Sequence, residues 1–385
     1  MKIDPYKHKE RYLKWKEKVK SGIPRLNKEN SGLVLNYLED MEKGVNISST
    51  NVKGSRSYIR LNSLKERLIF FAFKFNELFD VKRIIDIREE QLIGFFSDMK
   101  NGIIKRRDGK DYQSVDSYAK VFKAFWHWHQ KVSRKKDIEI KDITIDLDTR
   151  GEKPKWVYLT EEQVRTLCET AKYEYRILIM FLFDTGIRAP TELMNIKVSD
   201  LYNNCKEVNV REEVSKTFGR RIKLMLCPEL LKEFIKIKKL KEEDYLFDFS
   251  PSSVNKYLKR LAVKLFGDKE SEAGGKYSQL TMYDFRHCSC CYWLPRYKSE
   301  SALKYRFGWK ESDKIHYYSE LLGMRDTIQQ EDLLIDVTKT EIEKRLLHAE
   351  TRSQMLEEDN NGMREQMKAI LEQMQKLQSK VGVLN

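Results

Sequence analysis

The residues best suited to chemistry lie between positions 184 and 319. They include two arginines, Arg188 in the segment DTGIR and Arg286 in LTMYDFRH, and a tyrosine, Tyr318, in IHYYSEL. Guanidinium groups bind phosphate oxygens through paired hydrogen bonds, which lysine does less well. A tyrosine hydroxyl, whose usual pKa is about 10, becomes a nucleophile when nearby cations lower the cost of ionising it. Together these residue types are suited to a reaction at a phosphodiester.

A lysine accompanies this set. Lys216 lies in the segment VSKTFGRRIK, between two stretches that alternate apolar and polar residues. An ammonium group at this place is able to donate a proton to a leaving oxygen. Arg220, Arg221 and Lys223 lie on the same predicted hairpin and compete with Lys216 for such a role.

In the order and spacing of these segments, the sequence resembles the tyrosine recombinase, or phage integrase, family. The match is close over residues 158–322 and loose over residues 30–135. The segments TGIRAPTEL and YSELLGM are similar in sequence to those of archaeal members carried by mobile elements. The resemblance implies a mainly α fold: a helical, SAM-like DNA-clamping domain, a catalytic domain with a small β-hairpin, and a helical C-terminal tail.

The resemblance also implies a role for each residue. Arg188 and Arg286 clamp the phosphate, and Tyr318 attacks the phosphorus to form a 3′-phosphotyrosyl link. Lys216 is the general acid that protonates the leaving 5′-hydroxyl. In the family the nucleophilic tyrosine lies nine residues after the last residue of the FGW segment, which favours Tyr318 over its neighbour Tyr317. We expect Tyr317 to pack against other side chains. Because the covalent link stores the bond energy, the reaction needs no metal, ATP or other cofactor.

The sequence departs from the family pattern at several positions. Tyr283 stands where the family usually has a histidine, and Trp309 stands where it has histidine or tryptophan. Neither accepts a proton near pH 7, although both are able to bind phosphate oxygens. Glu192 and His287 are expected to support the site. The general base for the nucleophile is open between His287 and His316.

The elements that must position these residues are mostly helices. In the first 150 residues, apolar periodicity predicts helices near 34–41, over 59–79, over 89–99 with Asp86 as N-cap, and over 114–132. In the last of these helices, Tyr118, Phe122, Phe125 and His129 share one face. That face fits either a base-stacking platform or a helix-bundle core, and its spacing favours the core.

After residue 158, the capping-box pattern TEEQ predicts a helix start, and an apolar helix over 173–185 ends at Gly186. Alternation over 207–211 and 221–226 predicts a hairpin. Helical patterns return at 228–239, 252–266, 282–293, 299–307 and 316–322.

These patterns predict four segments along the chain. Residues 1–145 form the DNA-clamping domain, 146–157 a linker, 158–330 the catalytic domain and 331–385 the tail. In the tail, heptad spacing from Ile342 to Leu384 favours a coiled coil or a docking helix, with a solvated helix as the alternative.

Charge indicates the class of partner. Residues 1–150 have a net charge of +11, residues 151–330 of +6 and residues 331–385 of −3. A polyanion is the natural partner of the first two segments, although a lysine-rich solvated surface would look the same. Charge alone does not distinguish DNA from RNA or from an anionic membrane surface.

Other features narrow the class of protein. The longest apolar run, residues 177–183, is far shorter than the roughly 20 residues of a membrane span. The N-terminus has no apolar signal core, and six cysteines form no disulfide framework. Cys288 and Cys291 lack a second pair of zinc ligands, so helix packing is favoured for them. We expect an intracellular, soluble protein that uses no metal, membrane or small-molecule substrate.

The function we expect is that of a site-specific DNA recombinase, an integrase of a mobile element. By resemblance it acts as a homo-tetramer on double-stranded DNA attachment sites, in the cytoplasm and associated with the nucleoid. Two alternatives remain: a non-cutting DNA-binding accessory protein on the same fold, and a topoisomerase with a tyrosine nucleophile. Tyr283 is the one residue that favours the non-cutting alternative.

The charge distribution predicts that binding to duplex DNA depends steeply on salt. If roughly 6–10 phosphates are contacted per protomer, affinity falls by about 10³–10⁵ between 50 and 200 mM salt, because each contact releases condensed counterions. Fluorescence anisotropy of a labelled duplex at increasing salt measures this slope. A flat response would contradict a DNA clamp.

Overall fold

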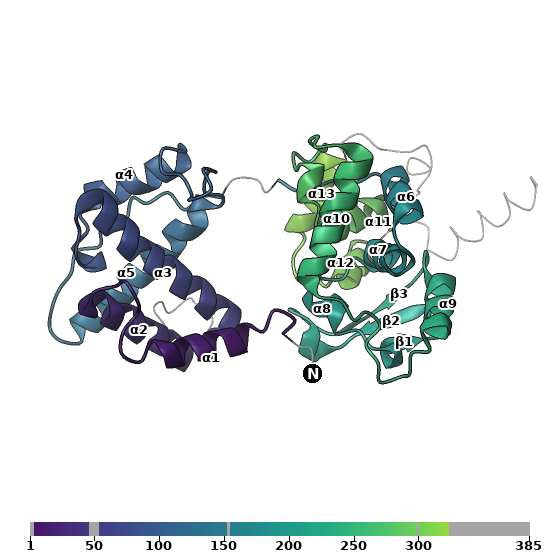
Figure 1. The fold of residues 1–385 in the computed structure, drawn as a ribbon, viewed down its shortest axis with the longest axis horizontal. Helices are drawn as coiled ribbons and strands as arrows, with labels where there is room; N and C mark the ends of the chain where they lie inside the picture. The colour runs from purple at the N-terminus through teal and green to yellow at the C-terminus, as the bar shows by residue number, and fades with distance from the viewer. Residues whose placement is uncertain (1–3, 46–53, 152–154, 298, 323–385) are drawn as a thin grey trace, which may run out of the picture. The chain divides into compact units, whose positions relative to one another are not determined.

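The computed structural model describes residues 4–45, 54–151, 155–297 and 299–322 (Figure 1). Over these residues the chain is mostly helical and has a single three-stranded antiparallel sheet. No helix among them is long and apolar enough to cross a membrane. The expected fold class, mainly α with a small sheet, is confirmed. The tail expected over 331–385 lies outside the described residues.

The front part of the chain, residues 4–151, is built from five described helices. They are α1 (His8–Lys18), α2 (Lys28–Lys43), α3 (Tyr58–Phe79), α4 (Glu89–Lys100) and α5 (Val115–Arg134). The helices predicted near 34–41 and over 59–79, 89–99 and 114–132 are confirmed. Helix α1 has no counterpart among the sequence predictions.

The predicted N-cap of α4 is wrong. Asp86 ends a short 3₁₀ turn (Ile84–Asp86), and its carboxylate binds the Arg83 guanidinium at 2.7 Å instead of capping a helix. The residue before α4 is Arg88, whose backbone N–H donates to the side chain of Gln91 at 3.1 Å. The helix start is therefore stabilised by Gln91 three residues into the helix.

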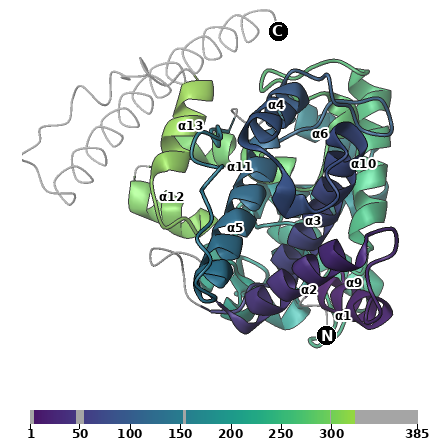
Figure 2. The same cartoon turned by 90° about the vertical axis from the view of Figure 1, so that its left-hand side faces the viewer.

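The core of the front part is aromatic. Phe71 and Phe122 meet edge to face with ring centroids 5.3 Å apart, and Phe75 and Phe95 do so at 5.1 Å. Such geometry adds roughly 0.5–1.5 kcal/mol per pair to the burial of the rings. Helix α3 packs on α1, α2 and α5 around this core (Figure 2). Because Phe122 and Phe125 are fully buried, their expected role in a helix-bundle core is confirmed.

The second part, residues 155–322, holds the remaining described helices. They are α6 (Glu161–Thr170), α7 (Tyr173–Thr185), α8 (Thr191–Met194), α9 (Pro228–Lys238), α10 (Pro251–Phe266), α11 (Asp284–Trp293), α12 (Glu300–Phe307) and α13 (Asp313–Leu321). The capping box at the start of α6 is confirmed, with Thr160 and Gln163 exchanging hydrogen bonds of 3.2 and 3.1 Å. The longer predicted helices are confirmed, with ends that differ by a few residues.

Helix α7 is the centre of this part and packs on α6, α9 and α11. Its apolar residues are nearly all buried, as its continuous hydrophobicity predicts. It ends at Gly186, whose φ of 59° is left-handed, and a Cβ there would lie 2.3 Å from the Phe307 ring. Only glycine fits this turn, which sends the chain on toward Arg188.

The sheet consists of β1 (Leu201–Tyr202), β2 (Glu207–Val210) and β3 (Arg220–Lys223) in sequence order. In its register Val208 lies opposite Ile222, and both are buried. The predicted hairpin is confirmed, but its second strand ends at Lys223 rather than at residue 226. The backbone N–H groups of residues 225–227 donate instead to one carboxylate oxygen of Asp184, at 2.7–3.1 Å.

Asp184 also forms a buried ion pair. Its other carboxylate oxygen lies 3.0 Å from the guanidinium of Arg306, and both side chains are almost inaccessible. Arg306 also donates to the backbone carbonyls of Asp184 and Lys223. This pair therefore joins the last turn of α7 to α12 and to the end of β3.

Replacing Arg306 with methionine should destabilise the fold strongly, because the buried Asp184 carboxylate loses its counter-charge. We expect a loss of about 3–5 kcal/mol in the free energy of unfolding. Urea denaturation measures the loss. The control is Arg165→Met, which removes an exposed pair with Glu161 and should cost about 1 kcal/mol or less. Equal losses in the two variants would contradict this view of the pair.

Candidate active site

Arg188 is held by three hydrogen bonds. Its backbone N–H donates to Glu192 Oε2 at 2.7 Å, and its Nη1 donates to Glu192 Oε1 at 2.9 Å. Its Nη2 donates to the carbonyl of Gly308 at 2.7 Å. The Arg188 side chain is 16% exposed, so it is anchored on one side and accessible on the other.

Glu192 neutralises a second arginine, which the sequence interpretation did not single out for this role. Arg220 on β3 is 1% exposed and donates to both carboxylate oxygens of Glu192, at 2.8 and 3.2 Å. Its Nε donates to the carbonyl of Arg306. Burial alone would raise the pKa of Glu192, but hydrogen bonds and charge from Arg220, and then from Arg188, hold that pKa below its ordinary value. Glu192 is therefore an ionised carboxylate shared by two arginines.

Arg286 on α11 is the second expected phosphate ligand. It is 4% exposed, and its two terminal nitrogens donate to the carbonyls of Gly186 and Phe307, each at 2.6 Å. Burial, and then the positive charge of Arg188, lower its pKa to about 10. The guanidinium therefore stays charged near neutral pH.

Both arginines donate hydrogen bonds to the backbone carbonyls of two consecutive residues. Arg286 binds the carbonyl of Phe307, and Arg188 binds that of Gly308. Gly308 caps α12 with a φ of 61°, and a Cβ there would lie 3.2 Å from Arg188 Nη1. The hydroxyl of Thr217, next to Lys216, also donates to the Gly308 carbonyl, at 2.9 Å. The turn at residues 307–308 thus sets the spacing between the two guanidinium groups.

Tyr318 on α13 lies inside this cluster and is 4% exposed. Its hydroxyl is 2.5 Å from Nδ1 of His287, and its ring is parallel to that of Trp309 at 5.9 Å. Burial raises the pKa of Tyr318 far above its usual value, and nearby Cys290 raises it further, whereas the positive charge of Arg286 lowers it. The hydroxyl is therefore neutral in this structure.

Tyr317 faces a different partner. Its hydroxyl accepts a hydrogen bond of 2.6 Å from Nε1 of Trp156. The indole of Trp156 also stacks on His287 with centroids 4.7 Å apart. Trp156 thus contacts both the helix that carries the tyrosines and the imidazole beside Tyr318. The sequence interpretation missed Trp156, because nothing in the local pattern relates it to residues more than 100 positions away.

Two expected site residues lie at the edge of the cluster. Lys216, on the connection between β2 and β3, is exposed and forms no hydrogen bond or ion pair with another described residue. Tyr283 is 46% exposed and lies edge-on to His287 at 5.2 Å. The other expected residues, Arg188, Arg286, Trp309, Tyr318, Glu192 and His287, are joined by the contacts described above.

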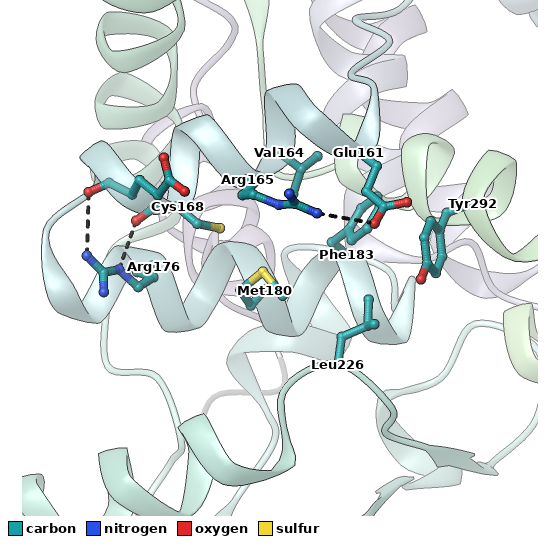
Figure 3. Close-up of a pocket in the computed structure, with 10 residues that line it drawn as sticks. Glu161, Val164, Arg165, Cys168, Arg176, Met180, Phe183, Leu226 and Tyr292 are labelled. Atoms are coloured by element: carbon teal, nitrogen blue, oxygen red, sulfur yellow. Dashed lines mark hydrogen bonds and ion pairs between the residues drawn. The ribbon is translucent and has the colours of Figure 1, made fainter. Parts of the chain in front are cut away.

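One groove lies away from this cluster. A groove of about 220 Å³ between α6 and α7 is lined mainly by Val164, Cys168, Met180, Phe183 and Tyr292 (Figure 3). Arg165 and Glu161 form an ion pair at its rim, and none of the expected site residues lines it.

Among the described residues, no group of three or more His, Cys, Asp or Glu side chains has the geometry of a metal site. All six cysteines are free and buried. Cys288 donates to the carbonyl of Val157 at 3.6 Å, and burial raises the pKa of its thiol. Cys288 and Cys291 pack inside α11, which agrees with the packing role expected for them.

Replacing Glu192 with glutamine should destabilise the protein by about 3–5 kcal/mol, because Arg188 and Arg220 lose their shared counter-charge. Folding lowers the pKa of Glu192, so the stabilisation that its ionised carboxylate gives the folded protein is complete above the ordinary pKa of 4.5. This stabilisation is lost as pH falls below that value. Denaturation of the wild type and the variant from neutral to acidic pH should therefore show that the difference between their free energies of unfolding narrows at low pH. Glu243→Gln, at an exposed carboxylate paired with Lys197, is the control and should show little difference at any pH.

Comparison with known proteins bears on the family and the fold. The model of the phage integrase family matches residues 157–323. No curated protein matches the chain significantly. Three solved structures share its fold. The first is XerH site-specific recombinase bound to a palindromic difH substrate, with 15% identity, coverage of 79% of this chain and 96% of that one, and a TM-score of 0.56. The second is a lambda integrase dimer bound to a COC′ core site, with 14% identity, coverage of 84% of this chain and 85% of that one, and a TM-score of 0.54. The third is the Tn1549 transposon integrase with transposon right end DNA, with 16% identity, coverage of 75% of this chain and 93% of that one, and a TM-score of 0.53.

At these identities the likeness to solved structures shows the fold, whereas the family model matches the sequence over residues 157–323. That range contains Arg188, Arg286 and Tyr318. The resemblance noted in the sequence is confirmed: over residues 157–323 this chain is a phage integrase family domain, with the fold of the tyrosine recombinases.

Proposed function

We propose that this protein is a site-specific DNA recombinase that cuts and rejoins strands through a 3′-phosphotyrosyl intermediate. The observation that carries the proposal is the pair of charged guanidinium groups, Arg188 and Arg286, spaced by the turn at residues 307–308 beside the hydroxyl of Tyr318. The structures of similar fold, XerH recombinase, lambda integrase and Tn1549 integrase, are complexes with DNA. Duplex DNA is therefore the proposed substrate.

The two arginines act on the phosphate. In the transition state, negative charge gathers on the non-bridging oxygens, and Arg188 and Arg286 donate hydrogen bonds to them. Because both side chains are already fixed by backbone carbonyls, little reorganisation is needed during the reaction. Donors of this kind are worth roughly 3–4 kcal/mol each in other enzymes. Trp309 and Tyr283 supply further N–H and O–H donors to the phosphate.

Tyr318 is the nucleophile and Lys216 the general acid. The Tyr318 oxygen forms a bond to phosphorus while the bond to the 5′-oxygen breaks, and Lys216 gives that oxygen a proton. The exposed position of Lys216 on the β2–β3 connection leaves its ammonium accessible to a DNA strand. Attack by a free 5′-hydroxyl from another strand then completes exchange, with the energy of the phosphodiester retained and no ATP consumed.

Exchange between two duplexes requires several active sites, so we propose a homo-tetramer on paired double-stranded attachment sites. The basic charge of residues 1–330 suits this partner. The role of a mobile-element integrase, acting in the cytoplasm on nucleoid DNA, follows from the same proposal.

A second candidate function is DNA binding without cutting. Two observations favour it: Tyr283 stands at the usual histidine position, and Tyr318 is 4% exposed. The presence of Arg188, Arg286, Lys216 and Tyr318 together argues for the enzyme, because a binding protein has no need of the full set.

The test of the proposed function is covalent trapping. Nicked duplexes from the DNA that flanks the gene are incubated with the protein without metal, and a denaturant-resistant protein–DNA adduct is measured. We expect an adduct with the wild type and with Tyr317→Phe, and none with Tyr318→Phe, because the charge of Arg286 acts on Tyr318, whereas Tyr317 hydrogen-bonds to Trp156. Loss of the adduct in Tyr317→Phe alone would reassign the nucleophile. Tight DNA binding without any adduct would favour the non-cutting function.

A further inference from the structure

The hydroxyl of Tyr318 must lose its proton when its oxygen attacks phosphorus. Burial raises its pKa far above neutral, so the hydroxyl does not ionise on its own in this environment. An efficient reaction therefore calls for a proton acceptor within hydrogen-bond reach of that oxygen. Neither Tyr283 nor Trp309 meets this need, because phenol and indole groups do not accept protons near neutral pH.

Most groups around Tyr318 are unable to act as bases. Arg286 remains protonated, since its pKa is lowered only to about 10. Burial raises the pKa of the Cys290 and Cys291 thiols, so they remain protonated as well. The aromatic rings that contact Tyr318, apart from His287, are those of Trp156, Trp309 and Tyr317.

His287 differs from these groups in both chemistry and position. Its Nδ1 lies 2.5 Å from the Tyr318 hydroxyl, within hydrogen-bond reach. The imidazole is fixed on one face by the stacked indole of Trp156, at 4.7 Å, and at its edge by Tyr283. Trp156 is itself anchored, because its backbone carbonyl accepts from Gly275 N at 2.9 Å and from Ser271 Oγ at 3.2 Å.

We propose that Nδ1 of His287 is the general base that takes the proton of Tyr318, and that Trp156 is the residue that positions the imidazole. This assignment rests on the proposed function. In the step, the bond from Tyr318 Oη to phosphorus forms and the bond from phosphorus to the 5′-oxygen breaks. One proton passes from Tyr318 to His287, and another passes from Lys216 to the 5′-oxygen. During rejoining both protons return, and no other reactant is consumed.

The test separates the base from the acid with two substrates. One is the nicked duplex described above, and the other carries sulfur in place of the bridging 5′-oxygen, so that its leaving group needs no proton. His287→Gln keeps hydrogen-bonding ability but not basicity, and it should slow adduct formation by about 100-fold or more on both substrates. Lys216→Ala should form the adduct slowly on the oxygen substrate, and its rate of adduct formation should recover on the sulfur substrate. His129→Gln, the same change on α5, is the control and should react like the wild type.

A second measurement distinguishes a base from a packing residue. A fluorinated tyrosine at position 318 ionises more readily than tyrosine and needs a base less. In the His287→Gln protein it should restore adduct formation by about tenfold or more, while a loss of packing would not be restored in this way. DNA affinity and the melting temperature are measured for each variant to show that it binds and folds.

The outcomes are distinct. If His287→Gln forms adducts within about threefold of the wild-type rate, well short of the effect of a general base, His287 is not the base. The same conclusion follows if the fluorinated tyrosine gives no recovery in that variant. If the wild type forms no adduct on either substrate, the proposed function itself is overturned, and the assignment of His287 fails with it.

Discussion

The arrangement of the candidate active site depends on one buried carboxylate. Glu192 lies between Arg188 and Arg220 and is 1% exposed, so its charge and theirs are largely removed from water. A buried charge of either sign is costly unless it is paired and fully hydrogen-bonded. The carboxylate meets this requirement by accepting from both guanidinium groups and from the Arg188 backbone. Without it, two positive side chains would face each other within the protein.

Backbone carbonyls complete the positioning. The turn at residues 307–308 offers one carbonyl to Arg286 and the next to Arg188, so the spacing of the two guanidinium groups follows from the geometry of the chain. Gly308 permits this close approach because its φ is positive and no side chain intervenes. Nearby, the Asp184–Arg306 pair fastens α7 to α12 and to the end of β3. Both ion-pair systems therefore contact β3 and α12.

The two adjacent tyrosines show how a helix separates neighbouring residues. Successive residues on a helix point about 100° apart, and here Tyr317 meets Trp156 while Tyr318 meets His287 and Trp309. Trp156 links the two arrangements, since its ring stacks on the same imidazole that contacts Tyr318. A residue just ahead of α6 thus contacts both Tyr317 and the imidazole that lies against Tyr318.

The sequence by itself indicated most of the longer helices, the hairpin and the candidate reactive residues. Local periodicity predicted α3, α5 and α7, the TEEQ segment predicted the start of α6, and motif order singled out Arg188, Arg286 and Tyr318. Only the tertiary structure decided that Arg220 shares Glu192 and that Trp156 contacts His287. The reason is physical: helix periods and caps depend on residues a few positions apart. Ion pairs and ring stacking join side chains that are distant in sequence, and they exist only once packing has removed those side chains from water.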